Sequence, residues 1–220
     1  MVSATLPFPN RYEAGRALAR ALGPFRQPLV LAVPRGGVEV AAPVATALAA
    51  ELDLLLTRKV GAPFDPELAL GAVAPDGEVL FHDVLLERFG LTPRDLAVQV
   101  AEARRELGRR LRTYRGDRPE PQLAGREVIV VDDGIATGFT LKAGLAWVRR
   151  QAPACLVLAV PVAPPEVWQE LEAWCDRGLC LATPEPFYAV GQFYQDFSAV
   201  DDARVINLLR ENWALGRKAH

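Results

Sequence analysis

The segment with the clearest chemical content places two adjacent carboxylates, Asp132 and Asp133, directly after the apolar run Val128–Val131. Such a run predicts a buried strand, and open α/β sheets bind their ligands at the carboxyl ends of strands. The residues that follow are small or hydroxylated, and Gly134 and Gly138 allow close approach of the backbone to a ligand. A loop of this kind, leading into a helix, can bind a phosphate through its amide and hydroxyl groups.

Carboxylates beside a phosphate-binding loop indicate a particular class of ligand. The hydroxyls of Thr137 and Thr140 suit a phosphate, whereas paired carboxylates suit hydroxyl groups or a hard cation such as Mg²⁺. A sugar phosphate would suit both, because its phosphate can bind the loop and its hydroxyl groups can bind the carboxylates. The alternative is a strand that ends in an Asp-Gly turn and binds nothing, but random turns rarely combine paired acids with such a loop.

The segment from Val128 to Thr140 resembles the phosphoribosyl diphosphate (PRPP) binding motif of the type I phosphoribosyltransferases in its apolar run, its acidic pair and its Thr-Gly-x-Thr loop. The resemblance implies that Asp132 and Asp133 are catalytic residues that hold the ribose hydroxyls and bind Mg²⁺, directly or through water. At Gly134 the family usually has an aliphatic residue. The implied phosphate loop consists of Gly134, Ile135, Ala136, Thr137, Gly138 and Thr140.

A second segment, Arg35, Gly36 and Gly37, follows the predicted strand Leu29–Val33 and begins a predicted helix. Glycine amides and a forked guanidinium can bind an anion there. In the family this position is the pyrophosphate loop, which often has a non-proline cis peptide bond, and we expect one before Arg35. On its own the segment also fits a degenerate dinucleotide-binding turn with Asp53 as the ribose acid, although the full glycine pattern is absent.

A third segment begins with Arg58 and Lys59, after the predicted strand Leu52–Thr57. It is similar to the Arg-Lys-x-Gly segment of adenine phosphoribosyltransferases, which enters the mobile loop that closes over the reactants. The resemblance makes both residues pyrophosphate ligands, and it makes Lys59 and Arg35 catalytic. Cations at the end of a buried strand are costly without an anion. The alternative is an ordinary Arg-Lys pair exposed on a loop.

Aromatic residues are dense in the polar segment Pro186–Phe197, beyond the last predicted core strand. Such rings are suited to stacking on a flat heterocycle. The segment is similar to the C-terminal hood of the hypoxanthine-guanine phosphoribosyltransferases, and the alternative is that its rings pack the C-terminal helix onto the domain. The implied base-binding residues are Phe187, Tyr188, Val190 and Asp196.

These residues must be positioned by an α/β fold, a parallel doubly wound sheet of the type I phosphoribosyltransferase kind with a C-terminal hood and an inserted lid region. Runs rich in Val, Leu and Ile alternate with segments of helical period, as in βα units. We predict one domain over residues 1–220, with the lid at about 61–125 and the hood at about 183–220. The predicted strands are Leu29–Val33, Leu52–Thr57, Glu127–Val131, Leu156–Val160 and Leu179–Ala182. The predicted helices are Tyr12–Leu22, Val38–Glu51, Thr140–Gln151, Pro165–Cys175 and Val200–Asn212.

The lid region contains a predicted hairpin, Ala69–Ala74 and Glu78–His82 around a Pro-Asp-Gly turn, and a long helix, Pro93–Arg115, capped by Thr92 with Asp95. The helix carries a basic cluster, which is either a nucleic-acid or phosphate surface or a solvated face paired with glutamates. The arginines of the cluster are Arg104, Arg105, Arg109, Arg110 and Arg112.

Composition limits the classes of function that remain. The chain is 50% hydrophobic and 24% charged, which excludes a disordered tail and a membrane-embedded protein. Its net charge of -2 argues against a nucleic-acid partner. Three scattered cysteines and the absence of a signal peptide predict a reduced, cytoplasmic protein. No apolar run reaches the roughly 20 residues of a membrane span, so we expect no membrane partner.

The resemblance implies a Mg²⁺-dependent transferase of nucleotide salvage, which moves the phosphoribosyl group of PRPP to a small nitrogenous acceptor such as a nucleobase and releases pyrophosphate. Ala136 stands where the hypoxanthine-guanine and xanthine enzymes have an aspartate, so we expect little activity with hypoxanthine or guanine. A homodimer is left open. The alternative function is a PRPP-sensing regulator without efficient transferase activity, which only the arginine cluster favours.

Overall fold

The computed structural model describes residues 5–216, and the chain divides into two compact units. The first unit comprises the chain up to Leu55, the segment Glu120–Thr137 and the chain from Gln151 onward. The second comprises Leu56–Pro119 and Gly138–Arg150. The predicted phosphate loop therefore crosses from the first unit to the second between Thr137 and Gly138.

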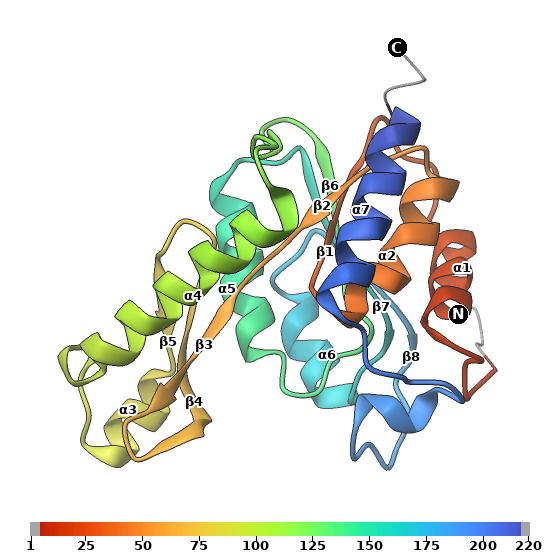
Figure 1. The fold of residues 1–220 in the computed structure, drawn as a ribbon. Helices are drawn as coiled ribbons and strands as arrows, with labels where there is room; N and C mark the ends of the chain where they lie inside the picture. The colour runs from red at the N-terminus through yellow and green to blue at the C-terminus, as the bar shows by residue number, and fades with distance from the viewer. Residues whose placement is uncertain (1–4, 217–220) are drawn as a thin grey trace. The chain divides into compact units, whose positions relative to one another are not determined.

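A parallel sheet of five strands forms the centre of the first unit (Figure 1). Its strands follow one another in space in the order β2-β1-β6-β7-β8, and every neighbouring pair is parallel. All four residues of β1 and the last four of β6 are buried, as expected for strands of a sheet that is covered on both faces. The predicted parallel α/β fold is thus confirmed. The strands are β1 (Leu29–Ala32), β2 (Glu51–Leu54), β6 (Glu127–Val131), β7 (Cys155–Val162) and β8 (Arg177–Ala182).

The strand order creates a topological switch point between β1 and β6. From β1 the chain moves to β2 on one side, and it later continues from β6 to β7 and β8 on the other side. Right-handed crossovers then place helices on opposite faces of the sheet. Ligands of open α/β sheets bind outside the carboxyl ends of the strands at such a point. The helices of this unit are α1 (Arg11–Ala21), α2 (Gly36–Ala47), α6 (Pro165–Glu172) and α7 (Asp202–Gly216).

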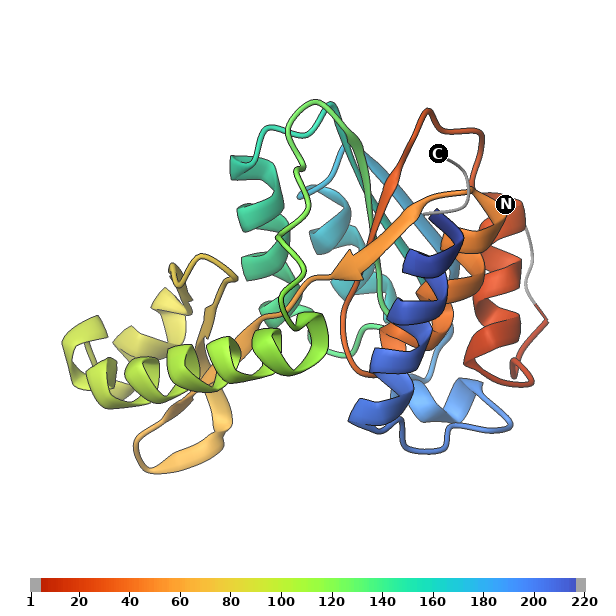
Figure 2. The same ribbon diagram turned by 45° about the horizontal axis from the view of Figure 1, so that its top comes forward.

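An antiparallel sheet of three strands, in the order β3-β4-β5, forms the second unit with three helices. Helix α4 contacts β3 and β4, as Figure 2 shows, and α5 contacts β4 and β5. Four consecutive residues of β4, from Leu70 to Val73, are buried, so both faces of this strand are covered. The elements are β3 (Arg58–Ala62), β4 (Asp65–Val73), β5 (Val79–Phe81), α3 (Asp83–Phe89), α4 (Ala97–Arg115) and α5 (Phe139–Arg150).

Two local predictions for the second unit are confirmed. The turn between β4 and β5 closes at Gly77, whose φ of 85° favours glycine. The Asp95 carboxylate accepts hydrogen bonds from the backbone N–H and the hydroxyl of Thr92, each at 2.7 Å, as a capping residue should. The 3-10 turn Pro93–Leu96 follows, and α4 begins at Ala97.

Several predicted boundaries are wrong. Helix α2 ends at Ala47 and not at Glu51, because Ala49 has a left-handed φ of 50° and β2 begins at Glu51. Arg58 and Lys59 do not enter a loop, since they begin β3, which pairs with β4. Helix α3 was not predicted at all. None of the helices within residues 5–216 combines the length and apolarity that a membrane span requires.

Candidate active site at the β1 and β6 strand ends

The loops that follow β1 and β6 lie side by side. The strands pair in parallel from Leu29 opposite Val128 to Ala32 opposite Val131, and the Val33 N–H extends the pairing by donating to the Val131 carbonyl at 2.9 Å. Both loops therefore leave the same edge of the sheet at the switch point.

The pyrophosphate-type loop packs directly on the acidic pair. A Cβ atom on Gly36 would lie 1.8 Å from Asp133 Oδ2, and one on Gly37 would lie 3.0 Å from Asp132 Cα. Real Cβ atoms do not approach so closely, so this contact requires glycine at residue 36. The peptide bond between Pro34 and Arg35 is cis, as expected.

Each carboxylate of the pair has one oxygen committed within the protein. The Asp133 N–H donates to Asp132 Oδ1 at 2.8 Å, and Arg11 Nε donates to Asp133 Oδ2 at 2.7 Å. Asp132 Oδ2 and Asp133 Oδ1 accept no hydrogen bond from an N–H or hydroxyl donor within the described residues 5–216, although the two carboxyl groups lie close to each other. Two acceptors on adjacent residues are therefore left for a ligand that brings two donors.

Burial makes both carboxylates hard to ionise. Desolvation raises the pKa of Asp132 well above its ordinary value, and the negative charge of Asp133 raises it further. Desolvation also raises the pKa of Asp133, an effect that its ion pair with Arg11 opposes. A ligand that donates hydrogen bonds or carries positive charge would stabilise the ionised pair.

This arrangement predicts that Asp132→Asn stabilises the protein at neutral pH. A carboxyl whose pKa is raised by folding destabilises the fold as the pH rises above its ordinary pKa of 3.8, and the loss is complete above the raised value. Removing the charge should gain about 0.5–2 kcal/mol at pH 7, the usual range for a single stabilising substitution. Thermal unfolding at pH 7 should show a higher Tm than for the native chain, and the gain should shrink toward pH 4.

The control for this effect is Asp95→Asn. Hydrogen bonds from Thr92 lower the pKa of Asp95, so its ionised form stabilises the fold at pH 7, and its removal should lower the Tm. A fall in Tm for Asp132→Asn at neutral pH would show that the buried pair is not electrostatically costly.

Arg11 is a site residue that was not predicted from the sequence. It is the first residue of α1, it is buried, and its guanidinium lies 3.7 Å from the centroid of the Phe197 ring. Its Nη1 donates to the Ser198 carbonyl at 2.8 Å. A cation at a helix N-terminus is opposed by the helix dipole, and this unfavourable position was the available signal that its side chain is used elsewhere.

Val190 explains the glycine that departs from the family pattern. A Cβ on Gly134 would lie 2.4 Å from Val190 Cγ1 and 3.0 Å from Val162 Cγ2. The side chain of Val190 thus fills the space that an aliphatic residue at 134 would need. The next residue, Ile135, is buried, and its N–H donates to the Val162 carbonyl at 3.0 Å, which anchors the loop to β7.

The rest of the phosphate loop is divided between the units. Ala136 and Thr137 are exposed in the first unit. Gly138, with a left-handed φ of 70°, and Thr140, in the first turn of α5, belong to the second unit. The Lys142 N–H donates to the Gly138 carbonyl at 3.0 Å, so the helical hydrogen bonds of α5 begin at the last glycine of the loop.

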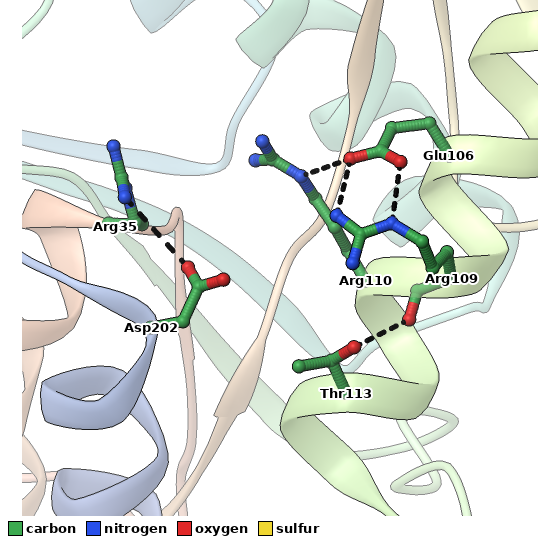
Figure 3. Close-up of polar contacts among 6 residues, drawn as sticks. All are labelled: Arg35, Glu106, Arg109, Arg110, Thr113 and Asp202. Atoms are coloured by element: carbon green, nitrogen blue, oxygen red, sulfur yellow. Dashed lines mark hydrogen bonds and ion pairs between the residues drawn. The ribbon is translucent and has the colours of Figure 1, made fainter.

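The three predicted cations lie in different units. Arg35, in the first unit, is half exposed, and its Nη1 lies 3.9 Å from Asp202 Oδ1 at the start of α7 (Figure 3). Arg58 and Lys59 lie in the second unit on β3, where Lys59 Nζ donates to Glu67 at 2.8 Å. The first unit alone therefore brings together Arg35, the two loop glycines and the acidic pair.

The predicted hood residues lie after β8 in the first unit. Tyr188 is 85% exposed, and Phe187 packs against Phe193 with ring centroids 4.8 Å apart. The Asp196 carboxylate accepts hydrogen bonds from the N–H and hydroxyl of Ser198. Their role in binding a base stays a prediction.

The arginine cluster on α4 is partly neutralised within the helix. Arg109 and Arg110 donate to the Glu106 carboxylate at 2.7–3.0 Å, as Figure 3 shows, and lower the pKa of Glu106 to about 2. Arg104 donates to the Gly77 carbonyl at 2.9 Å and so ties the helix to the β4–β5 turn. Arg105 and Arg112 are exposed on the same helix.

Residues 12–198 match the sequence model of a family described as "Phosphoribosyl transferase domain". The match covers most of the chain, and the chain belongs to this family.

The proteins that are similar to the chain include two curated relatives and one solved structure. "Putative phosphoribosyl transferase MT0597" and "Putative phosphoribosyl transferase Rv0571c", from Mycobacterium tuberculosis strains CDC 1551 / Oshkosh and H37Rv, are each 42% identical over 207 residues, which are 92% of this chain and 46% of theirs. The chain thus spans a little under half the length of these relatives. The crystal structure of TT1426 from Thermus thermophilus is 42% identical, with a TM-score of 0.81 over 94% of this chain and 99% of that one.

Proposed function

We propose that the chain transfers the phosphoribosyl group of PRPP to a nitrogen nucleophile and releases pyrophosphate. The observation that carries the proposal is the contact between the two loops at the switch point, where the Gly36 backbone lies against the Asp133 carboxylate. Amides that suit an anion and carboxylates that suit hydroxyl groups there meet at one edge of the sheet. PRPP presents both groups on adjacent carbon atoms. Membership of the phosphoribosyl transferase family supports the same reaction.

In this proposal the acidic pair binds the ribose ring of PRPP. The two available oxygens, Asp132 Oδ2 and Asp133 Oδ1, accept the two ring hydroxyls. Their negative charge also stabilises the positive charge that develops on the ribose when pyrophosphate departs. Arg35 and the amides of Gly36 and Gly37 bind the departing pyrophosphate, and Arg35 exchanges the distant Asp202 for this stronger anion.

Mg²⁺ fits this donor set only in part. Carboxylate oxygens are suitable ligands, and Mg²⁺ commonly takes one or two carboxylates and completes its shell with water and substrate phosphates. No group of three potential ligands occurs within residues 5–216, so PRPP would hold the ion, and Asp132 and Asp133 would contact it through water while their available oxygens accept the ring hydroxyls. The ion would neutralise charge on the leaving pyrophosphate.

The remaining assignments depend on the resemblance of their segments to the family. Thr137, Gly138 and Thr140 would bind the 5-phosphate and thereby orient the reacting carbon through remote binding energy. Arg58 and Lys59 would bind pyrophosphate. Phe187, Tyr188, Val190 and Asp196 would contact the acceptor.

The first test is stabilisation by PRPP with Mg²⁺. A ligand that binds only the folded state stabilises it by about 2.7 kcal/mol at 100 times its Kd, which corresponds to roughly 5–11 °C in Tm for a chain of this size. We expect this shift for the native chain and a much smaller one for Thr140→Ala, which removes a phosphate ligand. No shift over a wide range of PRPP concentrations would refute the proposal.

The acceptor is tested by measuring pyrophosphate release with PRPP, Mg²⁺ and each common nucleobase. Alanine at residue 136 cannot assist proton transfer at the imidazole edge of a purine, and β7 ends in Pro161-Val162 without a lysine that could recognise a 6-oxo group. We expect kcat/KM for hypoxanthine and guanine to be about two to four orders of magnitude below that for the true acceptor. Efficient turnover of guanine would show that this argument is mistaken.

The second candidate function is a PRPP-sensing regulator that binds nucleic acid. The exposed Arg105 and Arg112, seven residues apart on one face of α4, favour it. Filter binding of RNA and DNA at two salt concentrations distinguishes the candidates, because an arginine surface that binds phosphates loses affinity steeply as salt rises. Salt-dependent binding without pyrophosphate release would favour the regulator.

A further inference from the structure

We infer that Arg11 is a positioning residue that orients Asp133 so that the acidic pair can bind the two neighbouring hydroxyls of a ribose ring. The inference rests on the proposed function, because it concerns how the chain binds the ribose ring of PRPP. Arg11 lies one residue before the matched family segment and is far from Asp133 in the sequence.

The guanidinium of Arg11 is held on three sides within the first unit. Its Nε donates to Asp133 Oδ2 at 2.7 Å, its Nη1 donates to the Ser198 carbonyl at 2.8 Å, and its plane lies over the Phe197 ring at 3.7 Å. A planar, forked cation is suited to such a set of contacts, whereas an ammonium group cannot reproduce it. The position of Asp133 Oδ2 is therefore set by groups from α1 and from the C-terminal segment.

The same C-terminal segment also holds the backbone of Asp133, through Tyr194. The Tyr194 hydroxyl donates to the Asp133 carbonyl at 2.5 Å, and the ring of Tyr194 packs against Phe197 with centroids 5.1 Å apart. Tyr194, Phe197 and Ser198 thus form a support behind the acid, with Arg11 as its link to the side chain.

This support determines which oxygen of Asp133 meets a ligand. With Oδ2 bound to Arg11, Oδ1 is the Asp133 oxygen left for a ligand, as Oδ2 is for the neighbouring Asp132. If Arg11 were absent, the Asp133 side chain could rotate, and the buried charge would have no partner. The two acceptors would then no longer be placed for two hydroxyls of one ring.

Arg11 should therefore matter more for the sugar than for the leaving group, although its Nε also lies near the pyrophosphate loop, 2.8 Å from the place of a Cβ on Gly36. Pyrophosphate contacts the loop of Arg35, Gly36 and Gly37 in the proposed function, and it has no hydroxyls for the acidic pair. The affinities of PRPP and of pyrophosphate alone, each measured calorimetrically with Mg²⁺, separate the two parts of the site.

We expect Arg11→Met to weaken PRPP binding about 10–100-fold, the effect of losing one charge-assisted hydrogen bond. Arg11→Lys should weaken it about 3–10-fold, because the charge remains while the fork and the stacking are lost. Both variants should weaken pyrophosphate binding less than PRPP binding, because pyrophosphate has no hydroxyls for the acidic pair and meets Arg11 only through the packing of the guanidinium against Gly36. The matched control is Arg16→Met on the same helix, which removes an exposed arginine paired with Glu13 and should change neither affinity.

The outcomes distinguish this inference from the proposed function. If the native chain binds neither PRPP nor pyrophosphate, the proposed function fails. If it binds both, and Arg11→Met leaves the PRPP affinity unchanged or weakens both ligands equally, Arg11 does not position the acid for the sugar. Circular dichroism checks folding. If both Arg11 variants are unfolded, Phe197→Leu carries the same test, because it removes the ring that lies beneath the guanidinium and against Tyr194, and the same selective loss is expected.

Discussion

Gly36→Ala is expected to eliminate most PRPP binding, although it adds only one methyl group. The new Cβ would lie 1.8 Å from Asp133 Oδ2 and 2.7 Å from Asp133 Cγ, so the loop or the acid must move. A displacement of about 1 Å in a positioned site can cost roughly 10²-fold in rate. We expect at least this loss in kcat/KM and a Tm shift with PRPP that is nearly abolished, together with about 1–3 kcal/mol of lost stability from overpacking.

The matched control is Gly108→Ala in the interior of α4. A Cβ at residue 108 would meet only Arg112 Nη1 at 3.6 Å, an ordinary contact with a flexible side chain. Alanine there should stabilise the protein by about 0.5–1 kcal/mol, because glycine is a poor helix former, and should leave PRPP affinity unchanged. Native PRPP affinity in Gly36→Ala would show that residue 36 does not contact the ligand site.

Lys59→Ala is expected to reduce kcat by about 10²–10³-fold with a small change in PRPP affinity. This prediction depends on the proposed function, in which Lys59 meets a pyrophosphate whose charge grows as the glycosidic bond breaks. In the free chain Lys59 pairs with Glu67 at 2.8 Å, but the glutamate side chain is 87% exposed. Such exposed pairs contribute little stability, so the lysine can exchange its partner readily.

Glu67→Gln is the control, because it removes the partner and keeps the cation. We expect kcat within about twofold of the native value for this variant, measured by pyrophosphate release under saturating PRPP. If Glu67→Gln reproduced the loss, the ion pair and not the cation would be required. If Lys59→Ala raised only KM, Lys59 would bind the ground state and would not stabilise the leaving group.

The sequence was sufficient for features that depend on neighbouring residues. An apolar run followed by Asp132 and Asp133 predicted β6 with its correct bounds, since a strand buried on both faces must be apolar throughout. The Pro-Asp-Gly turn and the Thr92–Asp95 cap were predicted for the same reason, because their hydrogen bonds join residues a few positions apart.

Other features could not be predicted, because they depend on partners distant in the sequence. Arg58 and Lys59 looked like the start of a loop, and they form a strand only because β4 is present to pair with them. No residue near Gly134 in the sequence explains its departure from the family pattern, because the space of its missing side chain is filled by Val190, which lies 56 residues further along the chain.

The sequence by itself thus determined which segments are the candidates for the chemistry: a pair of acids, a glycine loop and a predicted phosphate loop. Only the tertiary structure decided how the acids are held. Arg11 reaches Asp133 across a sequence separation of 122 residues, and its other contacts come from Phe197 and Ser198. No local sequence pattern specifies the contact between Arg11 and Asp133, because it results from the packing of α1 and the C-terminal segment around one edge of the sheet.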